Sequence, residues 1–148
     1  MKRTDLILEC SRDERATILP PASLDDLKRC QNGLLAAGYP RIPQRYFAFL
    51  RNKCNGFDGD FTLYGTKPFH SNISGLVPDI VSANMESGHK TYMKHGLLIG
   101  FIFYRSSYEN YFYNTRTGLF EVRNNLINNL EREYKTFNAL FYGEWLLS

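Results

Sequence analysis

The stretch from Ile42 to Gly65, IPQRYFAFLRNKCNGFDGDFTLYG, constrains the fold of this chain more than any other. Pro43 suits the first position of a helix, where the missing backbone N–H costs nothing. Tyr46, Phe49 and Leu50 then follow at helical spacing and form one apolar face. The pattern therefore predicts a helix that begins at Pro43 and runs for about three turns.

The second half of this stretch predicts a break and then a strand. The Asn-Gly pair at 55–56 ends the helix, because glycine takes positive φ without penalty. After a turn at Gly59, Phe61 and Leu63 alternate with their neighbours as residues of a strand do, which predicts a strand over 60–65. Every conspicuous residue here suits folding and packing, so the stretch favours a binding protein over an enzyme.

Three further helical segments follow from capping signals and apolar spacing. Ser23 is typical of a helix N-cap, and Gly38 followed by Pro40 ends the helix that it starts. A short helical piece is predicted within 77–85. Apolar residues that step by three or four predict a C-terminal helix over 130–145.

The middle of the chain predicts a sheet. The run at 97–104 is apolar and β-prone, and two further strands are expected at 108–113 and 119–122. The links between them are short, which forces antiparallel neighbours. Residues 1–148 are therefore predicted to form a single α+β domain, an antiparallel-rich sheet flanked by N-terminal and C-terminal helices, with the helices on one side of the sheet.

Composition and charge limit the classes of function. Apolar residues make up 43% of the 148 residues and charged residues 22%, as in ordinary soluble proteins. The net charge of +3 is spread as +4 over residues 1–53 and −1 over residues 54–148. This excess is too small for a protein that binds nucleic acid by electrostatic attraction, which needs a dense basic stripe. The longest apolar run is too short to span a bilayer, so no membrane partner is expected.

The cysteines indicate a reducing compartment. Cys10, Cys30 and Cys54 contain no CxxC pair, so neither a disulfide framework nor a zinc site is predicted. Buried, reduced thiols and a cytoplasmic location are the expectation. The segment 4–10 fits either a short strand or a helical turn, and it lacks the long apolar run of a signal peptide.

A search for catalytic or cofactor motifs finds none, so we expect no catalytic residue, no cofactor and no metal. No nucleophile elbow or phosphate-binding loop occurs. His70, His89 and His95 do not have metal-ligand spacing, and the last two lie in a Gly-containing segment where solvated side chains are expected. Asp58 and Asp60 lack the rest of a calcium loop and are expected as turn aspartates.

One strand has the composition of a recognition surface. Aromatic residues are 15% of the chain, and YENYFY at 108–113 concentrates them. Alternation places one half of this strand against the helices and leaves the other half for cross-strand packing, for a protein partner or for stacked bases. The mild charge disfavours bases. The two halves are Tyr108, Asn110 and Phe112 on one face, and Glu109, Tyr111 and Tyr113 on the other.

The order of these segments resembles the SUKH superfamily, which includes fungal cell-wall-assembly regulators and many bacterial proteins. The resemblance is carried by IPQRYFAFL, NGFDG, LYG, LLIGF, YENYFYNTRTGLFEV and YKTFNALF, in that order. It covers residues 40–145, and the NGFDG and LYG segments look closest to the YrhA-like branch.

The resemblance implies an α+β fold and, for bacterial single-domain members, an immunity protein that binds and neutralises a cognate protein toxin. The eukaryotic branch implies the alternative, a regulatory domain that binds an endogenous protein. No catalytic residues come with the family. Immunity proteins against basic nucleases are often acidic, whereas this chain carries +3. The residues expected to contact a partner are Asp58, Asp60, Tyr64, Tyr108, Glu109, Tyr111 and Tyr113.

Overall fold

This computed structural model describes residues 15–147, so the expectations for Cys10 and for residues 4–10 lie outside the described part. Its helices are α2 (Leu24–Ala36), α3 (Gln44–Asn52), α4 (Ile80–Ser87), the 3-10 turn η1 (His89–Thr91) and α5 (Phe137–Leu147). Its strands are β1 (Thr17–Ile18), β2 (Phe57–Asp58), β3 (Thr62–Leu63), β4 (Phe69–Ser71), β5 (Gly75–Val77), β6 (Gly96–Tyr104), β7 (Ser107–Asn114), β8 (Leu119–Asn124) and β9 (Leu130–Tyr134).

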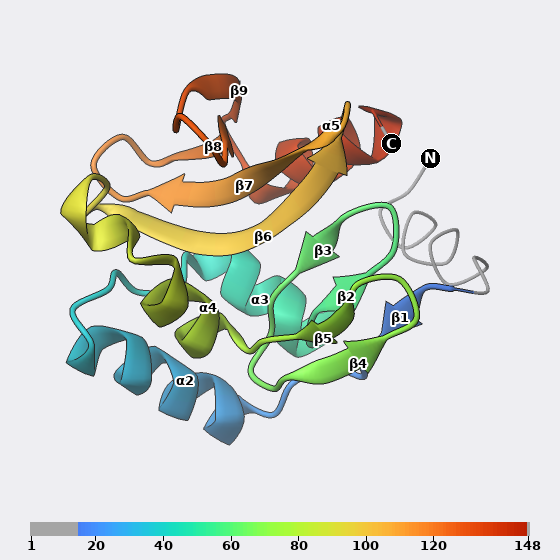
Figure 1. Cartoon of the computed structure of the whole chain (residues 1–148). Coiled ribbons are helices and arrows are strands. Elements are labelled where there is room, and N and C mark those ends of the chain that lie inside the picture. The colour runs from blue at the N-terminus through green and yellow to red at the C-terminus, as the bar shows by residue number, and fades with distance from the viewer. Residues whose placement is uncertain (1–14, 148) are drawn as a thin grey trace.

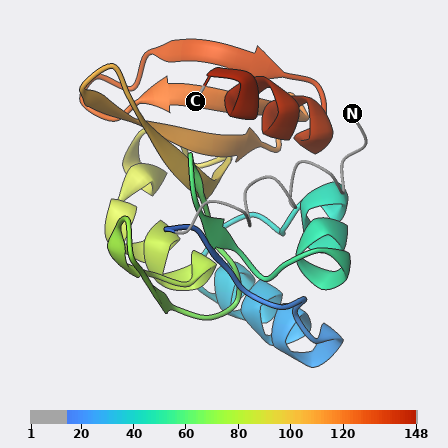
Figure 2. The same cartoon turned by 90° about the vertical axis from the view of Figure 1, so that its right-hand side faces the viewer.

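The described strands form an antiparallel sheet of seven strands in the order β1-β2-β3-β6-β7-β8-β9, and β4 pairs with β5 in a separate hairpin. The predicted α+β class and the meander of β6, β7 and β8 are therefore confirmed. In Figure 1, α2, α3 and α4 lie below the long strand β6, whereas α5 lies beside the upper part of the sheet. Figure 2 shows α5 lying along the strands of the C-terminal half.

The capping and turn signals act where the sequence predicts them. Ser23 caps α2, because its side chain accepts a hydrogen bond from the backbone N–H of Asp26 (3.1 Å). Pro43 is the N-cap of α3, so the helix begins at Gln44, one residue later than predicted. Gly56 takes a φ of 91° after the helix, as the Asn-Gly break requires.

The C-terminal helix is shorter than predicted, and its first predicted residues form β9. Leu130 and Tyr134 have helical spacing with Phe137, but β8 offers its open edge to residues 130–134 and pairs with them. The helix begins only at Phe137, where the Thr136 hydroxyl accepts a hydrogen bond from Ala139 (3.1 Å). The helical spacing of the apolar residues therefore extends across the junction between β9 and α5.

The helices do not lie on one side of the sheet, which corrects the prediction. On one face, Tyr111 of β7 packs against Phe61, and Phe61 packs against Phe141 of α5. On the other face, Phe112 packs against His89 of η1, with ring centroids 5.0 Å apart. Both faces of β7 are therefore covered at its centre, where Tyr111 and Phe112 are buried.

The core between α3, α5 and the sheet is built from aromatic rings. Phe137 of α5 lies 5.0 Å from Tyr46 and 4.9 Å from Phe49 of α3, measured between ring centroids. Phe141 continues the contact toward the sheet, 5.4 Å from Phe61. Tilted ring pairs of this kind contribute about 0.5–1.5 kcal/mol each beyond the area that they bury.

The pairing of β3 with β6 depends on glycine at position 100. A Cβ atom on Gly100 would collide with the backbone carbonyl oxygen of Thr62 in β3. Because this oxygen belongs to the backbone, a change of side-chain rotamer could not relieve the collision. The pairing of β6 with β7 also shifts its register between Leu98 and Gly100. The close approach of Thr62 to β6 therefore requires that residue 100 has no side chain.

We expect Gly100→Ala to lower the free energy of unfolding by about 2 kcal/mol or more, since the added methyl group forces two strands apart. Urea denaturation followed by circular dichroism measures it. Gly33→Ala is the matched control, because a Cβ there meets Val81 at an ordinary 3.5 Å in the middle of α2. That control should be neutral or stabilising by up to about 1 kcal/mol. Equal effects of the two changes would contradict the close approach.

His89 is buried rather than solvated, which corrects the sequence-based expectation. Its Nε2 lies 2.7 Å from the carbonyl oxygen of Gly96, which can only accept, so Nε2 carries the proton and Nδ1 accepts from the Ser87 hydroxyl. The ring also packs against Tyr39 at 5.3 Å. Burial lowers the pKa of His89 below the usual 6.5, and the charge of Lys90 adds to this, although the Gly96 carbonyl opposes it.

This buried imidazole makes stability depend on pH. Below about pH 6.5 the unfolded chain binds a proton at His89 that the folded protein resists, so the free energy of unfolding falls as pH falls. The slope should reach at most about 1.4 kcal/mol per pH unit for this group. His89→Gln, which can still donate to Gly96, should have a shallower slope between about pH 7 and pH 5 in urea titrations. Parallel slopes would contradict the assignment.

Candidate protein-binding face

Two turns lie side by side at one end of the meander. The strands β6, β7, β8 and β9 lie in this order and alternate in direction. The β6–β7 turn and the β8–β9 turn therefore lie at the same end of the sheet. The backbone N–H of Asn125 donates to the carbonyl oxygen of Tyr108 (3.0 Å) and joins the two turns. Large apolar side chains are exposed on both. We call this set the hairpin-end face: Phe103 (61% exposed), Tyr108 (52%), Leu126 (83%) and Ile127 (67%).

A groove of about 700 Å³ lies next to the hairpin-end face. It arises because β3 is short: its pairing with β6 ends at Thr62 and Phe101, and β6 continues to Tyr104. The side of β6 beyond Phe101 therefore borders a hollow instead of another strand. The groove is lined by Arg15, Asp58, Gly59, Asp60, Phe61, Thr62, Ile73, Ser74, Phe101, Ile102, Phe103, Tyr108, Asn110 and Asn125.

The exposed rings hold one another in place. The Tyr108 ring centroid lies 5.7 Å from that of Phe101 and 5.0 Å from that of Phe103. Phe101 in turn packs against Tyr64 at 6.1 Å, which ties the cluster to the core. Rings fixed in this way lose little conformational entropy when they contact a partner.

The turn that carries the rings is strained. Arg105 and Ser106 form its two central positions with φ values of 51° and 67°, a conformation that favours Asn or Gly. Each such residue costs about 1–2 kcal/mol. The Arg105 guanidinium lies 5.1 Å from the centroid of the Tyr104 ring, and the Ser107 hydroxyl donates to the Tyr104 carbonyl (3.3 Å). Strain of this kind is concentrated at functional sites.

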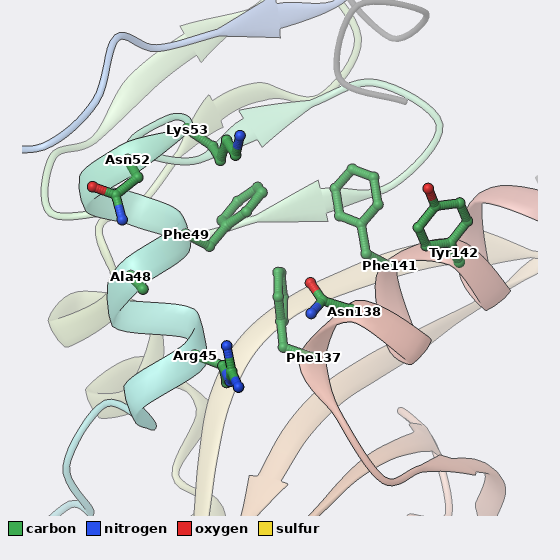
Figure 3. Close-up of a pocket in the computed structure, with 9 residues that line it drawn as sticks. All are labelled: Arg45, Ala48, Phe49, Asn52, Lys53, Phe137, Asn138, Phe141 and Tyr142. Atoms are coloured by element: carbon green, nitrogen blue, oxygen red, sulfur yellow. The ribbon is translucent and has the colours of Figure 1, made fainter. Parts of the chain in front are cut away.

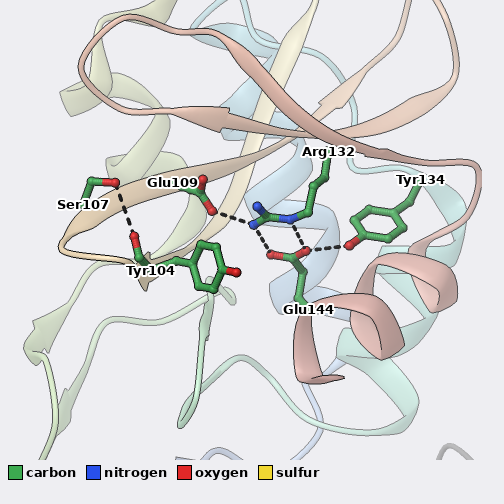
Figure 4. A network of polar contacts seen from close by, with 6 residues as sticks. All are labelled: Tyr104, Ser107, Glu109, Arg132, Tyr134 and Glu144. Carbon is green, nitrogen blue, oxygen red and sulfur yellow. Dashed lines mark hydrogen bonds and ion pairs between the residues drawn. The ribbon is translucent and has the colours of Figure 1, made fainter. Parts of the chain in front are cut away.

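Behind the face, one guanidinium joins three elements, as Figure 4 shows. Arg132 of β9 donates through Nε and Nη2 to both carboxylate oxygens of Glu144 in α5, each at 2.9 Å. The same Nη2 donates to Glu109 of β7 at 2.5 Å. Tyr134 adds a hydrogen bond from its hydroxyl to Glu144 (2.6 Å). We call these four residues the Arg132 clasp.

The clasp places ionised groups inside the protein. Glu109 and Glu144 are buried, and the Arg132 side chain is only 21% exposed. Burial opposes the charge of Arg132, but the hydrogen bonds to Glu144 and Glu109 outweigh it and raise its pKa. Burial and the bond to Glu144 raise the pKa of Tyr134 to about 12. At neutral pH Arg132 therefore keeps its charge and Tyr134 keeps its proton.

Three of the residues predicted to contact a partner line the same groove. Asp60 and Tyr108 are exposed there. Asp58 lines it too but is buried, and its carboxylate accepts hydrogen bonds from the Thr62 and Ser71 hydroxyls. Asp58 therefore joins β2 and β3 to the β4–β5 hairpin and offers little to a partner.

The other four predicted contact residues point away from solvent or lie outside the groove. Tyr64 is buried, Tyr111 is fully buried, and Glu109 belongs to the Arg132 clasp. Burial is also the main reason why the pKa of Tyr111 lies above its usual value. Tyr113 is half-buried against Phe120, 4.9 Å away.

Sequence reasoning missed the most exposed members of the face. Phe103 belongs to the apolar run at 97–104, which the pattern assigned to a buried strand, and nothing local shows that β3 ends before it. Leu126 and Ile127 lie between asparagines, and the Asn124 side chain accepts hydrogen bonds from both of their backbone N–H groups (2.8 and 3.3 Å). An apolar pair within an asparagine-rich turn was the available signal.

Two further observations concern the described residues. Among residues 15–147, no three His, Cys, Asp or Glu side chains gather closely enough to bind a metal ion. None of the helices in this part of the chain has the length and apolar content needed to cross a bilayer.

Comparison with known proteins gives no match: no family model, curated protein or solved structure matches the chain.

We expect Arg132→Met to lower the free energy of unfolding by about 3 kcal/mol, because two buried carboxylates lose their counter-charge. Urea denaturation at neutral pH measures the loss. Adding Glu144→Gln to the same chain should restore part of it, since a neutral amide tolerates burial better than an unpaired carboxylate. A loss below about 1 kcal/mol, as for exposed ion pairs, would contradict the clasp.

Proposed function

We propose that this protein is an immunity protein that binds a cognate protein toxin through the hairpin-end face and the adjoining groove, and so neutralises it. The observation that carries the proposal is the cluster of exposed, mutually packed aromatic rings of Phe103 and Tyr108 beside a groove. Binding energy at protein interfaces is concentrated in aromatic and arginine anchors, and Arg105 adds the latter at the turn. The resemblance to the SUKH superfamily supplies the class of partner.

The charge of this face supports a partner held mainly by apolar contacts. Asp60 lies exposed in the groove, whereas Arg15 lines it and Arg105 lies at the adjacent turn, so neither sign dominates. A strongly basic nuclease would be captured faster by an acidic face. We therefore propose a toxin whose contact surface is apolar and of mixed charge.

The proposal is tested by producing the protein together with the product of the adjacent gene. We expect a complex that co-purifies and cells that grow when both proteins are made. The double variant Phe103→Ala, Tyr108→Ala should weaken the complex at least about 30-fold, the effect of removing a hot spot. Isothermal titration calorimetry of the purified pair measures the affinity, and growth of the producing cells measures protection.

Met85→Ala is the matched control, because Met85 is 59% exposed on α4 and lies outside the face. It should leave the affinity unchanged, and both variants should keep the parent's melting temperature. An adjacent gene product without toxicity, or full affinity in the double variant, would refute the proposal. If the protein instead captures an endogenous cellular protein through the same two rings, the regulatory alternative replaces immunity.

A further inference from the structure

A second, separate groove lies between α3 and α5, as Figure 3 shows. Its α3 side comes from one helical stripe, with Ala48 and Phe49 at its centre. Phe137 and Phe141 of α5 form the opposite apolar wall. The hollow measures about 140 Å³, close to the ~150 Å³ of an engineered cavity that accepts one benzene molecule. The groove therefore has room for one aromatic or large aliphatic side chain.

The ends of this groove are basic. Arg45 lies in the first turn of α3 and Lys53 is its C-cap (Figure 3), eight residues further on, which is about 12 Å along a helix. Neither forms an ion pair with another residue in the range 15–147. Arg45 also lies in the first turn of α3, where the helix dipole disfavours a cation, so its charge does not serve the stability of the helix.

We propose that this groove binds a segment of a protein partner that inserts one aromatic side chain and places a carboxylate on each side of it. The two cations match two anions, and the apolar walls match the ring between them. In an extended segment, residues four apart are separated by about 13 Å, which fits the spacing of Arg45 and Lys53. The site is independent of the hairpin-end face.

The walls favour an inserted side chain over stacked nucleic-acid bases. Phe137 and Phe141 are 1% and 5% exposed, so neither offers an open ring face. The Phe49 ring lies tilted at 53° and 52° to these two. Base stacking needs accessible, flat ring faces, whereas a hollow between ring edges accepts a single side chain.

The experiment titrates the ¹⁵N-labelled full-length protein with the peptide acetyl-EGFGE-amide and follows amide chemical shifts. We expect saturable shifts in α3 and α5. The peptides acetyl-KGFGK-amide and acetyl-EGSGE-amide should each bind at least about tenfold more weakly, because the first reverses the charge and the second lacks the ring. The double variant Arg45→Glu, Lys53→Glu should reverse the preference between the acidic and basic peptides.

Lys28→Glu on α2 is the matched control and should leave the preference unchanged. Equal binding of the three peptides, or shifts outside α3 and α5, would overturn the proposal. Tighter binding of a uridine hexanucleotide, or a dimer in sedimentation that Ala48→Phe abolishes, would assign the groove to RNA or to a second copy instead. If Leu6→Asp with Leu8→Asp shifts the same amides without peptide, the chain's own N-terminal residues are the occupant and the proposal fails.

Discussion

The Arg132 clasp is the interaction on which the C-terminal half of the structure depends. β9 pairs with only one strand, and α5, which follows it along the chain, packs against the sheet through Phe137 and Phe141. The guanidinium joins both to Glu109 of β7 and thereby sets the position of α5. That position supplies Phe137 and Phe141 to the aromatic core and one wall to the groove beside α3.

Unequal strand lengths create the candidate binding face. β6 spans nine residues, whereas its neighbour β3 spans two, so the far end of β6 continues past its partner. The meander then brings the β8–β9 turn beside the β6–β7 turn and groups four exposed apolar side chains. Glu109 and Tyr108 are adjacent in β7, so the clasp holds one side of this strand while the other side is open to a partner.

Local signals in the sequence predicted the helices α2, α3 and α4 and the strands β3, β6, β7 and β8. The short strands β1, β2, β4, β5 and β9 were not predicted, because they depend on pairing between distant segments. Ser23, Gly56 and the meander strands follow from capping, backbone freedom and alternation, which depend on neighbouring residues. The prediction of a helix over 130–134 was wrong, because these residues pair with the edge of β8 and the spacing of apolar residues does not show where such an edge lies. In the candidate site, Tyr108 and Asp60 were predicted and are exposed. Tyr111 was predicted and is buried, because the sequence does not show that both faces of the sheet are covered.

Hydrogen exchange of backbone amides, followed by mass spectrometry with and without the co-purified partner, locates the surface that the partner covers. If the partner binds at the hairpin-end face, exchange should slow in residues 102–108 and 125–128 and stay unchanged in α2 and in the β7–β8 turn. Protection confined to other segments, with unchanged exchange in both hairpin ends, would show that the partner binds elsewhere.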